Sequence, residues 1–288
     1  MTKPLTIVSC PASSRSGYGD HSRDLLRSLI KMDKFDVRIL DQRWGTCPRT
    51  ELSETLNKDL YDLVIKQDVR QQADIWIQIT VPGEFTPVGK FNIGITAGVE
   101  TDRVSPEWLE GCNRMDLIIV PSQHTKNGFL CTYDKMDQNT KQVVDKLQLN
   151  QPMEVLFEGI NTEVFNKTNK IDKTIEDKFN SIEEDFCYLV CGHWMNGAQG
   201  EDRKDIGMTI KTFLETFKDV SKRNMPAMVL KTGIGFSVTE RQIILQKIEG
   251  IKRQIKTEKE LPSVYLLWGS LYESEMNSLY NHPKIKAM

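Results

Sequence analysis

Short apolar runs rich in β-branched residues alternate with amphipathic segments along the first half of the chain. Such alternation is typical of parallel strands joined by helical crossovers, so we expect a parallel sheet here. The amphipathic stretch 21–30 predicts one helix, and the Ser-Pro pair at 105–106 predicts the start of another, with a capping serine before a first-turn proline. The strand-like runs lie at 5–10, 35–40, 74–79, 91–96 and 116–122.

A second alternating series follows a break in the pattern after residue 149. Residues 153–157 form one more strand-like run, and a Glu-Gly turn and a polar stretch come after it. We therefore predict an α/β protein with two tandem Rossmann-like domains, residues 1–158 and 159–288. In the second domain, strand-like runs at 186–194, 227–232 and 264–269 alternate with expected helices at 205–218, 239–256 and 273–280.

The final residues, 283–288, begin a further strand-like run at the end of the sequence. A domain with about three strands is short for an open α/β sheet, whose halves normally carry more. We expect the second domain to be incomplete and the sequence to be truncated at its C-terminus.

The overall charge and hydrophobicity narrow the class of protein. The 288 residues include 38 Lys and Arg against 40 Asp and Glu, which argues against an electrostatic grip on nucleic acid. No apolar stretch approaches the roughly 20 residues that a membrane-spanning helix needs, and the N-terminus lacks the apolar core of a signal peptide. We expect a cytoplasmic protein with no membrane span and with a small or neutral partner.

The six cysteines are scattered along the sequence. Cys187 and Cys191 share one strand-like run, but no second pair completes a zinc site. We interpret all six as free thiols in a reducing compartment.

The first candidate site is the segment 13–21, SSRSGYGDH, between the first expected strand and the first expected helix. Gly17 and Gly19, on either side of Tyr18, permit positive φ and a close backbone approach to a ligand. The helix, expected to start near residues 20–21, would offer N–H groups to an anion or a hydroxyl-rich ligand. The segment is neither a GxGxxG fingerprint nor a P-loop, and alternatively the glycines serve only a flexible turn.

Two carboxylates, Glu100 and Asp102, follow another expected strand. Carboxylates at a strand end act as acids, bases or ligands for hydroxyl groups. We interpret Asp102 as a capping residue of the next helix. Glu100 is a candidate catalytic residue. Alternatively, it too has only a structural role.

A third candidate site follows the first strand of the second domain. His193 lies near the end of that strand, and Arg203 and Lys204 precede the next helix. Adjacent cations at the positive end of a helix dipole indicate a phosphate site. Alternatively, they belong to a solvated charge cluster with Glu201 and Asp202.

A fourth candidate is the segment 268–272, Trp-Gly-Ser-Leu-Tyr, which again connects a strand to a helix. The backbone at Gly269 and Leu271 would be able to hold a planar base there. On its own the segment is also typical of a simple turn.

These segments, taken in order, resemble the GT-B glycosyltransferases, and within them the retaining family often called glycosyltransferase group 1 or family 4. The resemblance runs over most of the chain. SGYGDHSRDL is similar to that family's N-terminal glycine loop and helix, VLFEGINTEVF to its crossing into the donor domain, and WGSLYESEMNSLY to its nucleotide-base loop. GVETDRVSPEWLEGCNRMDLIIVPSQHTKNGF resembles its fourth-strand acid, tryptophan helix and VPS strand.

The resemblance implies a hexosyltransferase that moves a sugar from a nucleotide-sugar donor to an acceptor hydroxyl, with retention of configuration. The N-terminal domain would hold the acceptor, a glycan, lipid or protein, and the C-terminal domain the donor, with transfer in the cleft between them. Neither a cofactor nor an obligatory metal is implied. Arg203 and Lys204 would offset the charge that grows on the departing diphosphate.

The resemblance also assigns roles to the other candidate residues. Glu100 would face the sugar or the acceptor hydroxyl. The segment around Tyr18 would line the cleft and approach the acceptor or the sugar phosphate. The donor-binding set would be His193, Arg203, Lys204, Gly269 and Leu271.

The sequence departs from the family pattern in two places. His193 stands where many relatives carry an early arginine, and the two cations are adjacent rather than separated. The glutamate-bearing E-G-F/x-G-x-P-x-x-E segment and the final helix are absent from the 288 residues. If these residues are the whole polypeptide, we expect impaired donor affinity and turnover.

Three other functions compete with this interpretation. A nucleotide-sugar 2-epimerase has the same two-domain layout and would act on the donor without an acceptor. A non-catalytic sugar- or nucleotide-binding protein would bind without forming product. A nicotinamide-dependent dehydrogenase is the least favoured, because the third glycine of its fingerprint is missing.

Overall fold

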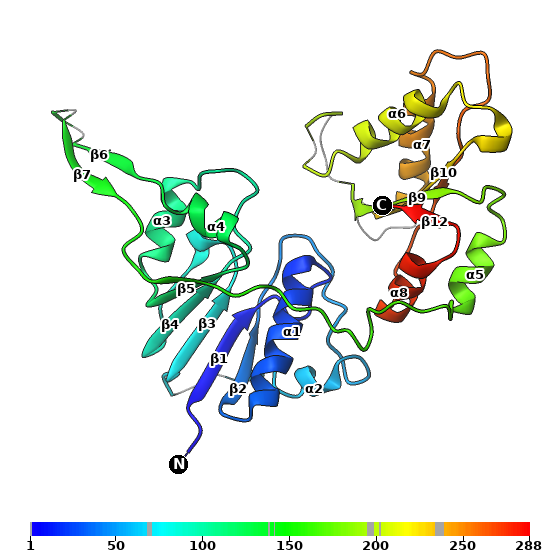
Figure 1. The fold of residues 1–288 in the computed structure, drawn as a ribbon. Helices are drawn as coiled ribbons and strands as arrows, with labels where there is room; N and C mark the ends of the chain where they lie inside the picture. The colour runs from blue at the N-terminus through cyan, green and yellow to red at the C-terminus, as the bar shows by residue number, and fades with distance from the viewer. Residues whose placement is uncertain are drawn as a thin grey trace. The chain divides into compact units, whose positions relative to one another are not determined.

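The computed structural model describes residues 2–67, 71–137, 139–140, 142–194, 199–201, 203–233 and 239–288. It divides into two compact units, Met1–Ile160 and Asn161–Met288, which are described in turn (Figure 1). The predicted first domain ends at residue 158, within the segment that leads into the second unit.

The first unit is built on a six-stranded sheet in which every neighbouring pair is parallel. The α/β prediction is confirmed, and each strand-like run of the first half contains a strand. The strand order is β2-β1-β3-β4-β5-β8, so the direction of winding reverses between β1 and β3. The strands are β1 (Leu5–Cys10), β2 (Asp36–Asp41), β3 (Ile75–Ile79), β4 (Phe91–Ile95), β5 (Leu117–Val120) and β8 (Met153–Val155).

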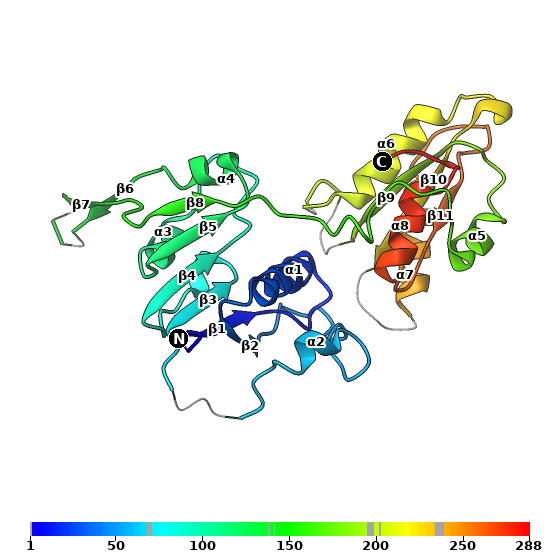
Figure 2. The ribbon, with the colours of Figure 1, turned by 60° about the horizontal axis from the view of Figure 1, so that its bottom comes forward.

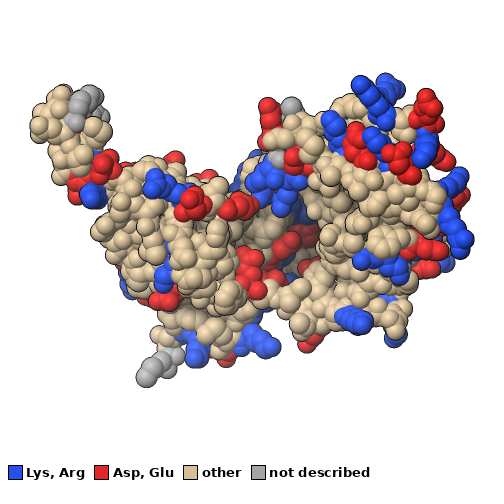
Figure 3. Space-filling model, turned by 45° about the horizontal axis from the view of Figure 1, so that its top comes forward, with Lys and Arg blue, Asp and Glu red and all other residues tan. Residues whose placement is uncertain are grey.

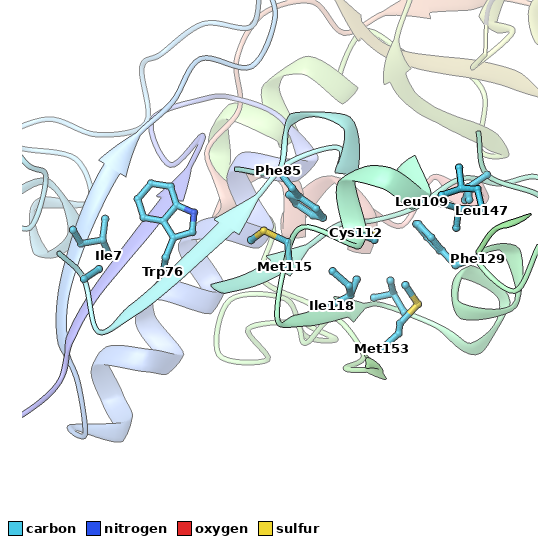
Figure 4. Packing of buried hydrophobic residues seen from close by; sticks show 13 residues of the cluster. Ile7, Trp76, Phe85, Leu109, Cys112, Met115, Ile118, Phe129, Leu147 and Met153 are labelled. Atoms are coloured by element: carbon cyan, nitrogen blue, oxygen red, sulfur yellow. The ribbon is translucent and has the colours of Figure 1, made fainter. Parts of the chain in front are cut away.

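Helices cover both faces of this sheet, because successive strand residues point to opposite sides. On β1, Val8 packs with Leu26 of α1, whereas Ile7 belongs to the cluster that includes Leu109 of α3. Figure 4 shows that second cluster, in which Trp76 lies on the side of Ile7 and Phe85 lies near Met115. The helices are α1 (Gly17–Met32), α2 (Lys58–Tyr61), α3 (Pro106–Cys112) and α4 (Gln123–Gly128), with a 3-10 turn, η1 (Pro82–Glu84).

An antiparallel hairpin lies outside the sheet of the first unit. It consists of β6 (Tyr133–Met136) and β7 (Val143–Leu147), and both ribbon views show it projecting away from the sheet (Figure 1 and Figure 2). The sequence pattern gave no prediction for this hairpin, because its residues are mostly polar or exposed. Leu147 alone of its strand residues is buried in the core.

The second unit has a four-stranded sheet, and here too every neighbouring pair is parallel. The order is β11-β10-β9-β12, so the winding reverses between β9 and β12. The last residues of the chain form the fourth strand, as the run at 283–288 predicts. The strands are β9 (Cys187–His193), β10 (Ala227–Gly233), β11 (Val264–Leu266) and β12 (Ile285–Ala287).

Two pairs of helices sandwich this second sheet. α6 and α7 pack on the face that carries Met228 and Leu230, and α5 and α8 pack on the face that carries Val229. The sequence predicts α6, α7 and α8 but not α5, which lies in a polar stretch. The helices are α5 (Lys173–Phe179), α6 (Ile206–Phe217), α7 (Glu240–Lys252) and α8 (Glu273–Asn281), with a 3-10 turn, η2 (Lys222–Asn224).

Basic and acidic side chains are interspersed over the face of the molecule drawn in Figure 3, in keeping with the near-balanced composition. No helix among the described residues combines the length and apolar character needed to cross a membrane. All six cysteines are free thiols. Burial raises the pKa of Cys10 and of Cys112 to about 12, so both thiols stay protonated and are poor nucleophiles.

Candidate functional site

In open α/β sheets, ligands bind beyond the carboxyl ends of the strands, at the point where the strand order reverses. In the first unit this point lies between β1 and β3, and in the second unit between β9 and β12. The candidate residues from the sequence fall at these same ends of the two sheets, and each unit therefore has a candidate site.

The segment around Tyr18 is helical, which corrects the predicted glycine loop. α1 begins at Gly17, three residues before the predicted start, because Ser16 caps it: the Ser16 Oγ accepts the Gly19 N–H at 3.1 Å. Neither Gly17 nor Gly19 has positive φ. Neither glycine therefore adopts the positive φ that this residue type permits.

The two glycines of this segment have different roles. A Cβ built on Gly19 would lie 2.1 Å from the Ser14 carbonyl oxygen, so only glycine lets α1 approach the preceding loop this closely. A Cβ built on Gly17 would meet nothing within 4 Å, and this residue is exposed. Gly19 is therefore required by packing, and only Gly17 leaves room beside the helix terminus.

Tyr18 joins three of the strand ends of the first unit. Its hydroxyl lies 3.2 Å from the Thr96 Oγ1 and accepts the Ala97 N–H at 3.0 Å, both just after β4. Its ring stacks on Trp44, in the loop after β2, with 4.0 Å between ring centroids. Burial raises the pKa of Tyr18, so the phenol stays neutral. The sequence reasoning missed Trp44, and it gave Thr96, which begins the candidate segment of Glu100, no role of its own.

A buried arginine fixes the loop between β1 and α1. Arg23 is only 4% exposed, and its Nη1 donates to the carbonyl oxygens of Ala12 at 2.8 Å and Ser14 at 3.0 Å. Its Nη2 pairs with Asp20. The sequence could have indicated that Arg23 is buried, because it lies on the buried face of α1, three residues before Leu26.

Glu100 lies in the loop after β4 and is exposed. The loop turns sharply at Gly98, which has φ +78, and a Cβ there would lie 2.1 Å from the Thr125 Cγ2. His124 Nε2 lies 3.4 Å from the Glu100 carbonyl oxygen. Glu100 and Tyr18 therefore both belong to the carboxyl edge of the sheet, next to residues 96–97.

The candidate cations of the second unit lie at the end of β9. His193 is the last residue of β9, and Arg203 and Lys204 come just before α6; all three are exposed. A Cβ built on Gly192 would lie 4.0 Å from the Lys204 Cγ, so the lysine stem passes over the end of the strand. The structure thus brings Lys204 to the strand that ends in His193.

The turn before α6 is held by Asp205, which has a left-handed backbone with φ 43. One of its carboxylate oxygens accepts the Gly200 N–H at 3.0 Å and the Met208 N–H at 3.3 Å. Asp202, one of the two neutralising partners in the charge-cluster alternative, lies outside the described residues. The turn sets Arg203 and Lys204 next to the N-terminus of α6, where the helix dipole is positive.

The ends of β10 and β11 are tied together by a lysine that the sequence reasoning missed. Lys231 Nζ donates to the Gly269 carbonyl oxygen at 2.8 Å, and Gly269 has φ +100. Next to it, the buried Thr232 hydroxyl has no hydrogen-bond partner among the described residues. Leu271 is 8% exposed and packs in the core, so its side chain serves stability and only its backbone is suited to a ligand.

No cluster of three or more potential metal-binding side chains (His, Cys, Asp, Glu) is found in the part of the chain that the structure describes. Among the candidate residues, Arg203 and Lys204 are cations in the second unit, and Glu100 is an exposed carboxylate in the first. Cations suit an anionic ligand, and a carboxylate with nearby hydroxyl and amide groups suits a hydroxyl-bearing ligand.

Comparison with solved structures shows the fold. The chain is similar to the apo structure of OtsA, with a TM-score of 0.52 and 11% identity, covering 96% of this chain and 76% of that chain. It is similar to a trehalose-6-phosphate synthase, OtsA, with a TM-score of 0.51, 12% identity and the same coverage. An E. coli structure bound with UDP-2-fluoro glucose matches with a TM-score of 0.49 and 12% identity, covering 95% of this chain and 75% of that chain.

The chain therefore has the GT-B fold of two Rossmann-like domains, as the resemblance implied. Its structural neighbours are glycosyltransferases. No family model matches the sequence, and no curated protein matches it.

Proposed function

We propose that this chain is a glycosyltransferase that moves a sugar from a nucleotide-sugar donor to an acceptor hydroxyl. The second unit binds the donor, and the first unit binds the acceptor. The GT-B fold shared with a trehalose-6-phosphate synthase supports this function. The chemistry of the two strand-end sites supports the assignment of donor and acceptor.

The observation that carries the proposal is the placement of Lys204 at the point where the strand order of the second unit reverses. The lysine stem lies over the end of β9, and Arg203 and the N-terminus of α6 are its neighbours in the chain. A nucleoside diphosphate carries its negative charge on phosphate oxygens, which cations and helix N-termini both stabilise. This corner of the sheet therefore matches the diphosphate of a sugar nucleotide.

The same cations have a catalytic role in the proposal. When the bond between the sugar and the diphosphate breaks, the electron pair stays on the departing phosphate oxygen. Arg203 and Lys204 stabilise that growing charge. They lower the barrier because the charge on the phosphate oxygen is larger in the transition state than in the ground state. This electrostatic role requires no metal ion, and chelation by EDTA should leave the reaction rate unchanged.

The first unit supplies polar groups that suit an acceptor. Tyr18, Thr96 and the Ala97 N–H form one connected set of hydrogen-bonding groups, and Glu100 follows them on the same loop. In the proposal Glu100 accepts a hydrogen bond from the acceptor hydroxyl and Tyr18 positions the loop. We also infer retention of configuration, with the acceptor hydroxyl attacking from the face that the diphosphate leaves and its proton passing to the departing phosphate oxygen.

The experiment that tests this function follows the donor. Calorimetric titration with UDP, GDP and ADP identifies the base, and proton NMR of the anomeric signals then follows the matching nucleotide sugars with and without candidate acceptors. Transfer that needs an acceptor supports the proposal. Conversion of the donor to its 2-epimer without an acceptor identifies an epimerase, and binding with no product identifies a non-catalytic binding protein; either result overturns it.

A further inference from the structure

A groove of about 460 Å³ lies beside β11, at the edge of the second sheet. Residues 264–268 form its floor, Arg241 and Leu245 of α7 line one wall, and Lys178 and Phe179 of α5 line the other. None of the candidate donor residues lines this groove. The groove reaches only Trp268, the first residue of the candidate segment 268–272.

The two walls of the groove come from opposite faces of the sheet. α7 packs with Met228 and Leu230 of β10, whereas α5 packs with Val229, which points the other way. β11 is the outermost strand on this side of the sheet. A groove lined from both faces must therefore pass around the outer edge of β11.

The backbone of β11 presents hydrogen-bonding groups to this groove. The Met228 N–H donates to the Ser263 carbonyl oxygen, and the Leu267 N–H donates to the Leu230 carbonyl oxygen, each at 2.9 Å. Residues 263 and 267 thus face β10. Alternate residues of a parallel strand face the same neighbour, so Val264 and Leu266 direct their N–H and C=O groups outward. Such an open edge can pair with another extended chain.

The charged side chains that line the groove have one sign, although the lining residue Tyr265 donates a hydrogen bond to the Glu184 carboxylate at 2.9 Å. Lys178 and Arg241 lie on its two sides, and no acidic side chain among the described residues lines it. Trp268, which is 37% exposed, adds apolar surface at the carboxyl end of the strand. The groove therefore combines an open backbone edge, two flanking cations and one aromatic surface.

We propose that the outer edge of β11 binds an extended, acidic peptide segment of a partner protein. The segment adds one strand to the sheet by main-chain hydrogen bonds, and its carboxylates pair with Lys178 and Arg241. Trp268 contacts an apolar side chain of the same segment. The competing explanation is that the two cations only protect an open sheet edge from aggregation.

The test uses the full chain and a fluorescein-labelled peptide with a Glu-Glu-Val-Val repeat, followed by fluorescence anisotropy. Successive side chains of a strand point to opposite faces of the sheet, so this repeat places carboxylates on the faces of both Lys178 and Arg241. A second peptide of the same sequence carries an N-methyl group on every residue, which removes its N–H donors and keeps its charge. We expect the methylated peptide to bind at least about tenfold more weakly than the parent peptide.

Charge variants complete the test. Lys178→Gln and Arg241→Gln should each weaken binding roughly two- to fivefold, as expected for exposed ion pairs. Lys173→Gln on α5 and Arg253→Gln after α7 are the matched controls, since neither lines the groove, and should bind as the parent does. Equal binding of the parent and the N-methylated peptide would show simple charge attraction and overturn the proposal. No binding of the parent peptide would overturn it in favour of edge protection.

Discussion

The two candidate sites occupy corresponding places in two parallel sheets, but they are built differently. In the first unit, side chains join one strand end to the next: Tyr18 reaches residues 96–97, and Arg23 holds the loop after β1. In the second unit, His193, Arg203 and Lys204 extend from the strand end as exposed side chains. The first site is fixed by internal hydrogen bonds, whereas the second presents positive charge at its surface.

This difference indicates where substitutions should affect folding and where they should affect binding. Buried hydrogen-bonded groups leave unsatisfied partners when they are removed, and exposed charges do not. We expect variants of the first site to lose stability and variants of the second site to lose affinity.

The largest expected effect is that of Gly19→Val. A side chain there would collide with the Ser14 carbonyl oxygen, so the free energy of unfolding should fall by about 3 kcal/mol or more. Gly17→Ala is the matched control, because that position is open, and its stability should change by less than about 1 kcal/mol. Urea denaturation followed by circular dichroism measures both. Equal losses in the two variants would contradict the assigned packing role.

A somewhat smaller effect is expected for Arg23→Met. This change keeps much of the side-chain volume but leaves the Ala12 and Ser14 carbonyl oxygens without their charged donor. The free energy of unfolding should fall by about 2–3 kcal/mol. Arg27→Met, on the same helix but half exposed, is the control and should lose less than about 1 kcal/mol. A loss in Arg23→Met no larger than in Arg27→Met would contradict the account of the loop.

A still smaller effect is expected for the stability of the second unit as the pH changes. In the second unit, burial lowers the pKa of His282, although Glu176 opposes this shift. The folded protein therefore keeps the ring neutral at a pH where the unfolded chain, with an ordinary histidine pKa near 6.5, already binds a proton. Stability of the second unit should fall as the pH drops below that value.

The variant His282→Phe tests this pH dependence. Phenylalanine keeps the aromatic stack on Phe179, which has 3.7 Å between ring centroids, but cannot bind a proton. Chemical denaturation at pH 7 and at pH 5.5 measures the free energy of unfolding at each pH. The difference between the two values should be smaller for the variant than for the parent chain. An unchanged difference would show that another group controls the acid sensitivity.

The sequence predicts most of the strands but little of what holds the sites together. Apolar runs such as the one at 5–10 place the strands correctly, since their pattern is local. The predicted start of α1 was wrong because Gly17 and Gly19 are typical of loops. In the structure, the Ser16 cap and the close packing of Gly19 outweigh that tendency.

Other features could not be predicted because they depend on residues far apart in the chain. Tyr18 and Thr96 are 78 positions apart, and Lys231 and Gly269 are 38 apart, so no local spacing links them. α5 lies in a polar stretch, and the apolar residues of β6 and β7 follow no regular period. The candidate site residues were located by their strand ends, and their roles remain proposals.

The central claim is that Lys204 holds the diphosphate of the donor. Calorimetric titration of Lys204→Ala with the preferred nucleoside diphosphate tests it, beside the control Lys222→Ala. Lys222 is highly exposed and precedes β10, at the amino end of that strand. We predict about tenfold weaker binding for Lys204→Ala with an unchanged melting temperature, and parent-like binding for Lys222→Ala. Equal affinity in the two variants would contradict the claim.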